Sequence, residues 1–186
     1  MKPRILGSAF AIILALTATT GAFADAAFAP DGTYEYALRQ GATTVATSTV
    51  TIKRSGSVIS LRESQTIAEP AIGNVQLNAD ESVLADSFTP LSFGGTTVSS
   101  GKSQEVKFAF ANNAGYFSVN GERLVVPVRI LPGTQAMIIQ DQTLVLSFLT
   151  LPAVLQATRA VAITVAVPTA SRVHAITVDS SPQTKP

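Results

Sequence analysis

Residues 43–67 read TTVATSTVTIKRSGSVISLRESQTI, and they predict two long β-strands joined by a tight turn. Thr, Val and Ile dominate this stretch, and β-branched residues favour the pleated backbone of a strand. We expect a strand over Thr43–Arg54, a turn at Ser55–Gly56–Ser57 and a returning strand over Val58–Ile67. Long consecutive strands of this kind are typical of a β-meander.

The alternating pattern continues on both sides of this stretch. Thr33–Gln40 and Glu105–Ala111 each place apolar residues on one face and polar residues on the other. The apolar faces consist of Tyr34, Tyr36 and Leu38 in the first segment and of Val106, Phe108 and Phe110 in the second. Further strands are expected over Val75–Ala79, Ser82–Phe93 (interrupted at Pro90), Tyr116–Val119, Glu122–Val128, Val161–Val167 and Ser171–Val178, with a loop or hairpin tip over Gly94–Ser103. The chain is therefore predicted to be mainly β, with about eight to ten antiparallel strands.

One hairpin turn is marked by Asn120–Gly121. Both residues tolerate a positive φ, which a two-residue turn between antiparallel strands requires. We expect positive φ at both positions.

One segment, Thr143–Thr158, is predicted to be helical. Its apolar residues recur at helical spacing, and Asp141 could cap the N-terminus. Pro152 interrupts the pattern, because proline removes a helical hydrogen bond. Either one helix kinks at Pro152, or a second short helix begins there with Thr150 as its cap.

The first 24 residues are typical of a secretory signal. Lys2 and Arg4 precede an apolar stretch over Ile5–Ala18, and Ala22–Phe23–Ala24 fits the small-x-small cleavage pattern. A second candidate, Ala27–Phe28–Ala29, would place Pro30 directly after the cut. The apolar stretch is shorter than the roughly 20 residues that span a bilayer, so no stable membrane anchor is expected after cleavage. We expect a signal over 1–24, one antiparallel β domain over 25–179 and a flexible polar tail over 180–186, in the periplasm or outside the cell.

Composition excludes several classes of function. Loss of Lys2 and Arg4 takes the 13 basic residues to 11, against 12 acidic ones, so a nucleic-acid partner is not expected. The chain has no cysteine and one histidine, His174, so no metal site is expected.

Gly95–Ser103 has five residues between its glycines, where a phosphate loop has four, and Ser99 and Lys102 lack the partner motifs of penicillin-binding enzymes. We expect no catalytic residue and no cofactor. The scattered acids are interpreted as solvated side chains of strand edges and turns: Glu35, Glu63, Glu69, Asp80, Glu81, Asp86, Glu105 and Glu122.

The phenylalanines are the strongest candidates for a site. Several lie on alternating strands, so we expect most of them to face one side of a curved sheet, under the helix near Leu144–Leu155. They form either plain core or the lining of a site for a hydrophobic or lipid ligand. The set consists of Phe88, Phe93, Phe108, Phe110, Phe117 and Phe148.

The chain resembles a bacterial periplasmic half-barrel group that is similar to the lipoprotein carriers LolA and LolB. The likeness rests on Thr33–Leu38, the turn at Gly41, the small-residue strand Ala46–Ile52, Asp86–Phe93 and the helical Thr143–Thr158. The resemblance implies a curled antiparallel sheet, or half-barrel, whose apolar concave face is covered by one helix and holds acyl chains in the carriers. It implies no catalytic residue and, without a cysteine, no lipid anchor.

Three functions remain as hypotheses from the sequence. The first is a non-enzymatic envelope or secreted protein that binds a hydrophobic or lipid ligand. The second is a structural or protein-interaction module of the cell envelope that uses exposed strand edges. The third and most remote is a secreted hydrolase.

Overall fold

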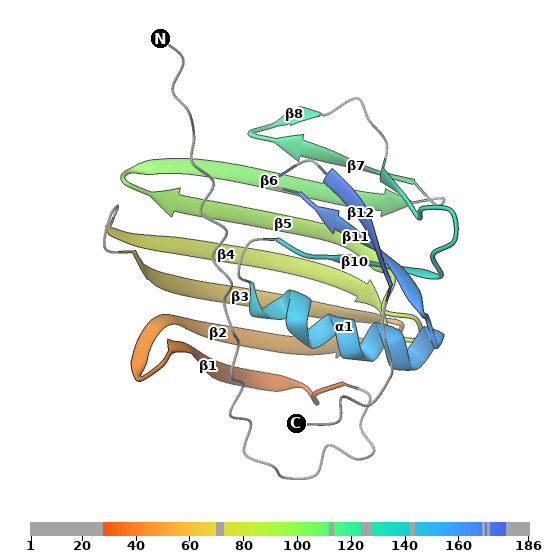
Figure 1. Cartoon of the computed structure of the whole chain (residues 1–186), viewed down its shortest axis with the longest axis horizontal. Coiled ribbons are helices and arrows are strands. Elements are labelled where there is room, and N and C mark those ends of the chain that lie inside the picture. The colour runs from red at the N-terminus through yellow and green to blue at the C-terminus, as the bar shows by residue number, and fades with distance from the viewer. Residues whose placement is uncertain are drawn as a thin grey trace, which may run out of the picture.

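The computed structural model describes residues 28–69, 73–111, 114–123, 128–141, 144–168, 170 and 172–177. Most of these residues belong to one large antiparallel sheet, in which consecutive strands pair in chain order from β1 to β8, while β9 also pairs with β7. The strands are β1 (Gly32–Gln40), β2 (Thr43–Ser55), β3 (Val58–Glu69), β4 (Gly73–Leu84), β5 (Pro90–Ser99), β6 (Lys102–Ala111), β7 (Ala114–Val119), β8 (Glu122–Arg123) and β9 (Val128–Arg129). The sheet is open, with β1 at one end of the strand order and β8 at the other (Figure 1).

A second layer covers one face of this sheet. It consists of a three-stranded sheet, β10 (Ala136–Ile139), β11 (Ala162–Val167) and β12 (Arg172–Thr177), together with the helix α1 (Val145–Thr158). Figure 1 shows these elements on the same side of the large sheet. α1 contacts β2 and β3, and β10 contacts β5. Within the described residues, no helix is both long and apolar enough to cross a membrane.

The expected meander and its parity are confirmed. Along β2, buried Ala46, Ser48, Val50 and Ile52 alternate with residues that face outward, and Val106, Phe108 and Phe110 are all buried in β6. The predicted hairpin at Asn120–Gly121 is also confirmed, with φ of 49° and 84° and with Val119 paired to Glu122. Asn120 further ties the turn to β6, because its Oδ1 accepts a hydrogen bond from the Glu105 amide.

The predicted boundaries between β4 and β5 are wrong. β4 runs without a break through Asp80 and Glu81, and the chain turns at residues 85–89, so the interruption within Ser82–Phe93 lies before Pro90, which begins β5. Of the two alternatives for Gly94–Ser103, a loop or a hairpin tip, the structure has the hairpin. The region forms the paired ends of β5 and β6, and its tip has positive φ at Ser100 and Gly101.

The second layer departs from the prediction in two ways, the strand β10 and the helix cap. β10 is an additional strand, and it pairs parallel with β11 across α1, whereas the sequence predicts a wholly antiparallel domain. Of the two alternatives at Pro152, the structure has the single helix, which runs through the proline, and no second helix begins at Thr150. The N-cap residue is Leu144 rather than Asp141, and its side chain makes no capping hydrogen bond. The predicted signal over 1–24 and the tail over 180–186 lie outside the described residues.

Candidate functional site

Four of the six candidate phenylalanines lie together on the covered face of the large sheet. Phe93, Phe108 and Phe117 are direct register partners across β5, β6 and β7, and Phe110 follows on β6. The Phe108 ring centroid lies 5.4 Å from that of Phe117 and 6.1 Å from that of Phe110. All four side chains are at most 9% exposed. The expectation that these aromatic residues share one face is therefore correct.

The other two candidates lie elsewhere. Phe88 is buried in the turn between β4 and β5, with a φ of 55°, and its ring lies 5.2 Å from that of Phe28. Phe148 lies on α1, is half-buried and does not join the described hydrophobic core. The expected cover also differs, because α1 lies against β2 and β3, whereas β10 reaches β5.

Two glycines make room for the phenylalanine rings. A Cβ at Gly115 would overlap the Phe108 ring, with Cζ at 2.6 Å, and would lie 2.9 Å from the Ala109 carbonyl oxygen. A Cβ at Gly95 would lie 3.0 Å from Cε1 of Phe93. The rings of Phe108 and Phe93 therefore occupy the space that a side chain at Gly115 or Gly95 would need.

As far as the described residues show, the covered face is filled rather than hollow. A hollow beside Phe93, Val106 and Leu144 has a cavity volume of about 10 Å³. That volume holds about one water molecule, whereas ligand pockets enclose several hundred cubic ångströms. The four phenylalanines on this face, Phe93, Phe108, Phe110 and Phe117, are therefore part of a packed hydrophobic core.

A buried carboxylate connects the large sheet to the helix. Glu63 on β3 is 1% exposed, and its Oε1 and Oε2 accept hydrogen bonds from the amides of Val145 and Leu146 at 3.1 and 3.0 Å. Its Oε1 also accepts a hydrogen bond from Ser48 Oγ at 2.6 Å. The first amides of a helix have no partner within it, so Glu63 supplies the cap that the local sequence lacks.

A second buried acid, Glu81, lies on the neighbouring strand β4. It is opposite Leu61 on β3 and Phe93 on β5, and its Oε1 is buried without a hydrogen-bond partner. Burial raises the pKa of Glu81 to about 8, because an apolar environment penalises the charged form. At neutral pH the Glu81 side chain is therefore mainly in its uncharged, protonated form.

The interpretation of the acids as solvated residues is wrong for Glu63 and Glu81. It is correct for Glu35, Asp80, Asp86 and Glu122, which are exposed, while Glu105 is half-buried and the Glu69 side chain lies outside the description. Strand parity could have found both buried acids, because they share the faces of Leu61 and Ala79.

The remaining residues that were weighed for chemistry are His174, Ser99 and Lys102. His174 is exposed on β12, and Ser99 pairs with Lys102 at the tip of the hairpin between β5 and β6. Among the described residues, no three His, Cys, Asp or Glu side chains gather as a metal site would require.

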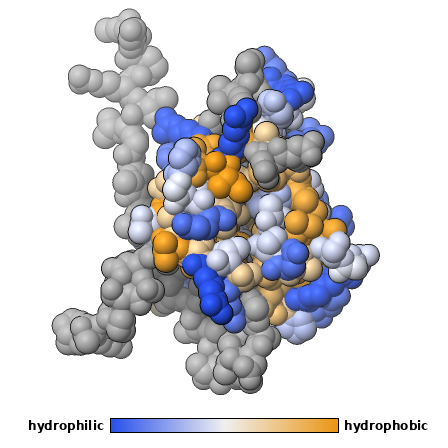
Figure 2. Space-filling model, turned by 90° about the vertical axis from the view of Figure 1, so that its right-hand side faces the viewer, coloured by the Kyte–Doolittle hydropathy of each residue, from blue (hydrophilic) through white to orange (hydrophobic). Residues whose placement is uncertain are grey.

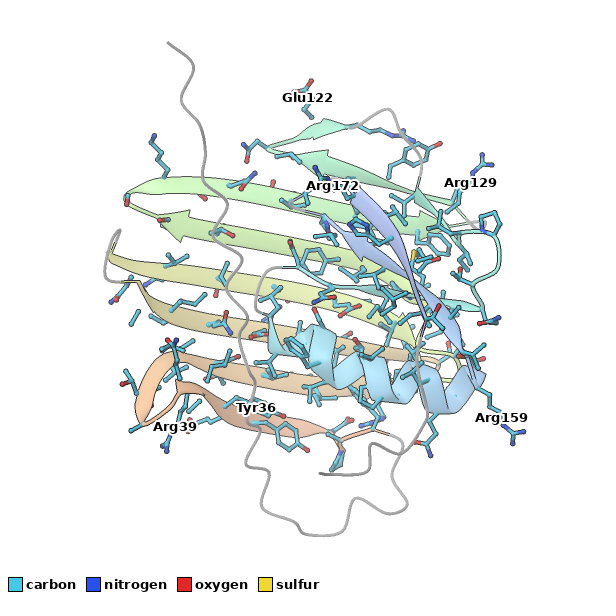
Figure 3. All side chains as sticks on the ribbon, viewed as in Figure 1. Tyr36, Arg39, Glu122, Arg129, Arg159 and Arg172 are labelled. Atoms are coloured by element: carbon cyan, nitrogen blue, oxygen red, sulfur yellow. The ribbon has the colours of Figure 1, made fainter. Side chains whose placement is uncertain are left out.

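The outermost strand β1 is the longest exposed edge. Among the described strands it pairs only with β2, and it contributes nine residues to the end of the sheet. Glu35, Ala37 and Arg39 are exposed, whereas Tyr36 and Leu38 turn toward the core. Figure 3 shows Tyr36 and Arg39 along this edge.

Comparison with known proteins found no family model, no curated protein and no solved structure that matches the chain. The resemblance to the lipoprotein carriers therefore stays a prediction.

Proposed function

We propose that the protein is a non-enzymatic module of the cell envelope that acts through contacts of its outer surface and sheet edges. The observation that supports this most directly is the filled inner face. The phenylalanines that could line a ligand site are packed, and the hollow beside them has room for about one water. The long edge of β1 offers backbone groups to a partner instead.

A carrier of a hydrophobic or lipid ligand is the second candidate, and one observation favours it. Oε1 of Glu81 is buried on the apolar face without a partner, and most buried polar atoms in proteins have one. A ligand with a polar head group could satisfy this oxygen if the second layer moved away. In either case the proposed location is the periplasm or the outside of the cell, in keeping with the predicted signal.

Two measurements on the purified protein decide between these candidates. The first is mass spectrometry of an organic extract, and the second is a titration with a fluorescent fatty acid. We expect no stoichiometric lipid and no saturable fluorescence change, because the inner face is already occupied by the chain itself. Stoichiometric lipid or saturable probe binding would overturn the proposed function in favour of the carrier.

Stability of two phenylalanine variants gives an independent check. Phe110→Ala should lower the free energy of unfolding by about 3–5 kcal/mol, because it empties a tightly packed position. Phe148→Ala is the matched control and should lose much less, since that ring is half-buried outside the core. A small loss for Phe110→Ala together with weakened probe binding would instead indicate a loosely covered ligand groove.

A further inference from the structure

Among the described strands, the edge of β1 is longer than the other ends of the two sheets. β8 and β9 contribute only two residues each, β10 has four residues that are all buried, and β12 has six residues. Natural sheets blunt their edges with short strands, prolines, bulges or repelling charges. β1 has nine residues and no proline, and the extra residue at its one register shift, Val45, lies in β2.

The sequence of β1 is complementary to itself. Antiparallel pairing of two β1 strands about Ala37 places Glu35 of each opposite Arg39 of the other. Both residues are exposed on the outer face, so each pair joins opposite charges across the new boundary. The same register places Tyr36 of each copy opposite Leu38 of the other, on the inner face. A register centred one residue away, on Tyr36, would place Glu35 opposite Ala37 and form neither ion pair.

We propose that β1 pairs antiparallel with β1 of a second copy of this chain, in the register centred on Ala37. The inference rests on the proposed function, because it names the partner of one of its exposed edges. The two-fold axis runs between the two Ala37 residues, perpendicular to the sheet, so the covered faces of both copies stay on one side. The two nine-stranded sheets then form one continuous sheet.

Disulfide cross-linking tests the register directly, because the chain has no cysteine of its own. Ala37→Cys places two thiols opposite each other, with Cα atoms about 4.5–5.5 Å apart, within the range of a disulfide. Thr47→Cys is the control, because Thr47 is the exposed partner of Ala37 on β2. Its two copies would lie about 14 Å apart across three strand spacings, beyond disulfide range. We expect a disulfide-linked dimer for Ala37→Cys and none for Thr47→Cys under mild oxidation.

A charge-swap series tests the same register without cysteines. Glu35→Arg and Arg39→Glu should each raise the dimer dissociation constant by roughly tenfold, as measured by sedimentation, because each places like charges opposite. The double variant Glu35→Arg/Arg39→Glu should restore the wild-type value. Such a restoration would not follow if the residues only supported the fold of one copy.

Some outcomes overturn the inference. A protein that stays monomeric at high concentration, or equal cross-linking of both cysteine variants, would exclude this pairing. Monomers that carry no lipid would leave the proposed function in place, whereas monomers with stoichiometric lipid would overturn both.

Discussion

Glu81 shows how one residue makes stability depend on pH. Its pKa in the folded protein is raised to about 8 by burial, from 4.5 for an exposed carboxyl group. The folded state therefore holds this proton more tightly than the unfolded state does. The stabilising contribution of the neutral acid is fully present below pH 4.5, and it is lost as the pH rises through about 8.

Glu81→Gln should remove this pH dependence. Between pH 5 and pH 8 the wild-type protein should lose up to about 1.4 kcal/mol of unfolding free energy per pH unit from this group, and the variant should lose much less. Urea unfolding at both pH values measures the difference. Asp80→Asn is the control, because Asp80 lies next to Glu81 but is exposed and paired with Arg62 at 2.7 Å. If Asp80→Asn flattened the profile as strongly as Glu81→Gln, burial would not be its cause.

Position 115 requires glycine because there is no room for a side chain, not because of the backbone conformation. Its φ is not positive, but a Cβ there would meet the Phe108 ring and the Ala109 carbonyl oxygen. Gly115→Ala should therefore lower the free energy of unfolding by about 1–3 kcal/mol, because the core is overpacked. Gly94→Ala is the matched control. Gly94 lies on β5, on the face of the large sheet that the second layer does not cover, and a Cβ there meets nothing within 4 Å. Thermal melts of both variants should separate them, and equal melting temperatures would contradict this packing argument.

At the scale of the element, α1 depends on a residue that lies far away in the sequence. Its N-cap residue Leu144 provides no capping side chain, and its first turn contains no acidic residue. Glu63, 82 residues before Val145, accepts the hydrogen bonds of the first two amides. The contact orients α1 on the sheet as well as capping it.

Glu63→Ala should detach the start of α1. It leaves the amides of Val145 and Leu146 and the Ser48 hydroxyl without their acceptor, so we expect a loss of about 3 kcal/mol or more in unfolding free energy. Chemical denaturation gives the magnitude, and increased binding of an apolar dye would report the uncovered face. Ser48→Ala removes one donor only and should cost about 1 kcal/mol. A Glu63→Ala protein as stable as Ser48→Ala would show that the cap does not hold the helix.

The same elements show what the sequence could and could not predict. Regular alternation predicts β2, β3 and β6, because most residues on their covered faces are apolar, with Ser48, Glu63 and Gln65 as buried polar exceptions. β4 was divided incorrectly, since Asp80 and Glu81 resemble a polar turn although Glu81 points inward. β10 is a run of four buried residues, too short to show a period, and its pairing with β11 depends on α1 lying between them. The Glu63 cap depends on long-range packing, which no local pattern contains.

At the scale of the whole molecule, the packing of the two layers explains why the cavity beside Phe93 has a volume of only about 10 Å³. The sequence predicted which face most phenylalanines occupy but not what covers them, because β10 was not foreseen. Figure 2 shows hydrophobic and hydrophilic residues interleaved at the end of the molecule where β4 turns into β5. Among the described residues, the exposed large hydrophobic side chains are Tyr116, Val161 and Ile176.

The predicted cleavage site is also argued at the scale of the whole molecule, because residues 28–31, which follow the predicted signal, pack on the fold. Phe28 contacts Phe88, the Ala29 carbonyl oxygen accepts a hydrogen bond from Arg54 Nη2 at 2.7 Å, and Asp31 pairs with Arg54 at 2.5 Å. Cleavage after Ala24 keeps all three contacts, whereas cleavage after Ala29 removes the first two.

We therefore expect secreted protein to begin at Asp25, and its intact mass to match residues 25–186. A chain that begins at Pro30 should be less stable than one that begins at Asp25 by about 1–2 kcal/mol, because it loses an aromatic pair and a charged hydrogen bond. Comparison of the two recombinant chains by urea unfolding measures that difference. Phe28→Ala in the longer chain is the matched control, and it should reproduce only the aromatic part of the loss. A secreted protein whose mass corresponds to residues 30–186, with stability equal to that of the longer chain, would show that this segment is dispensable and that the later site is the one used.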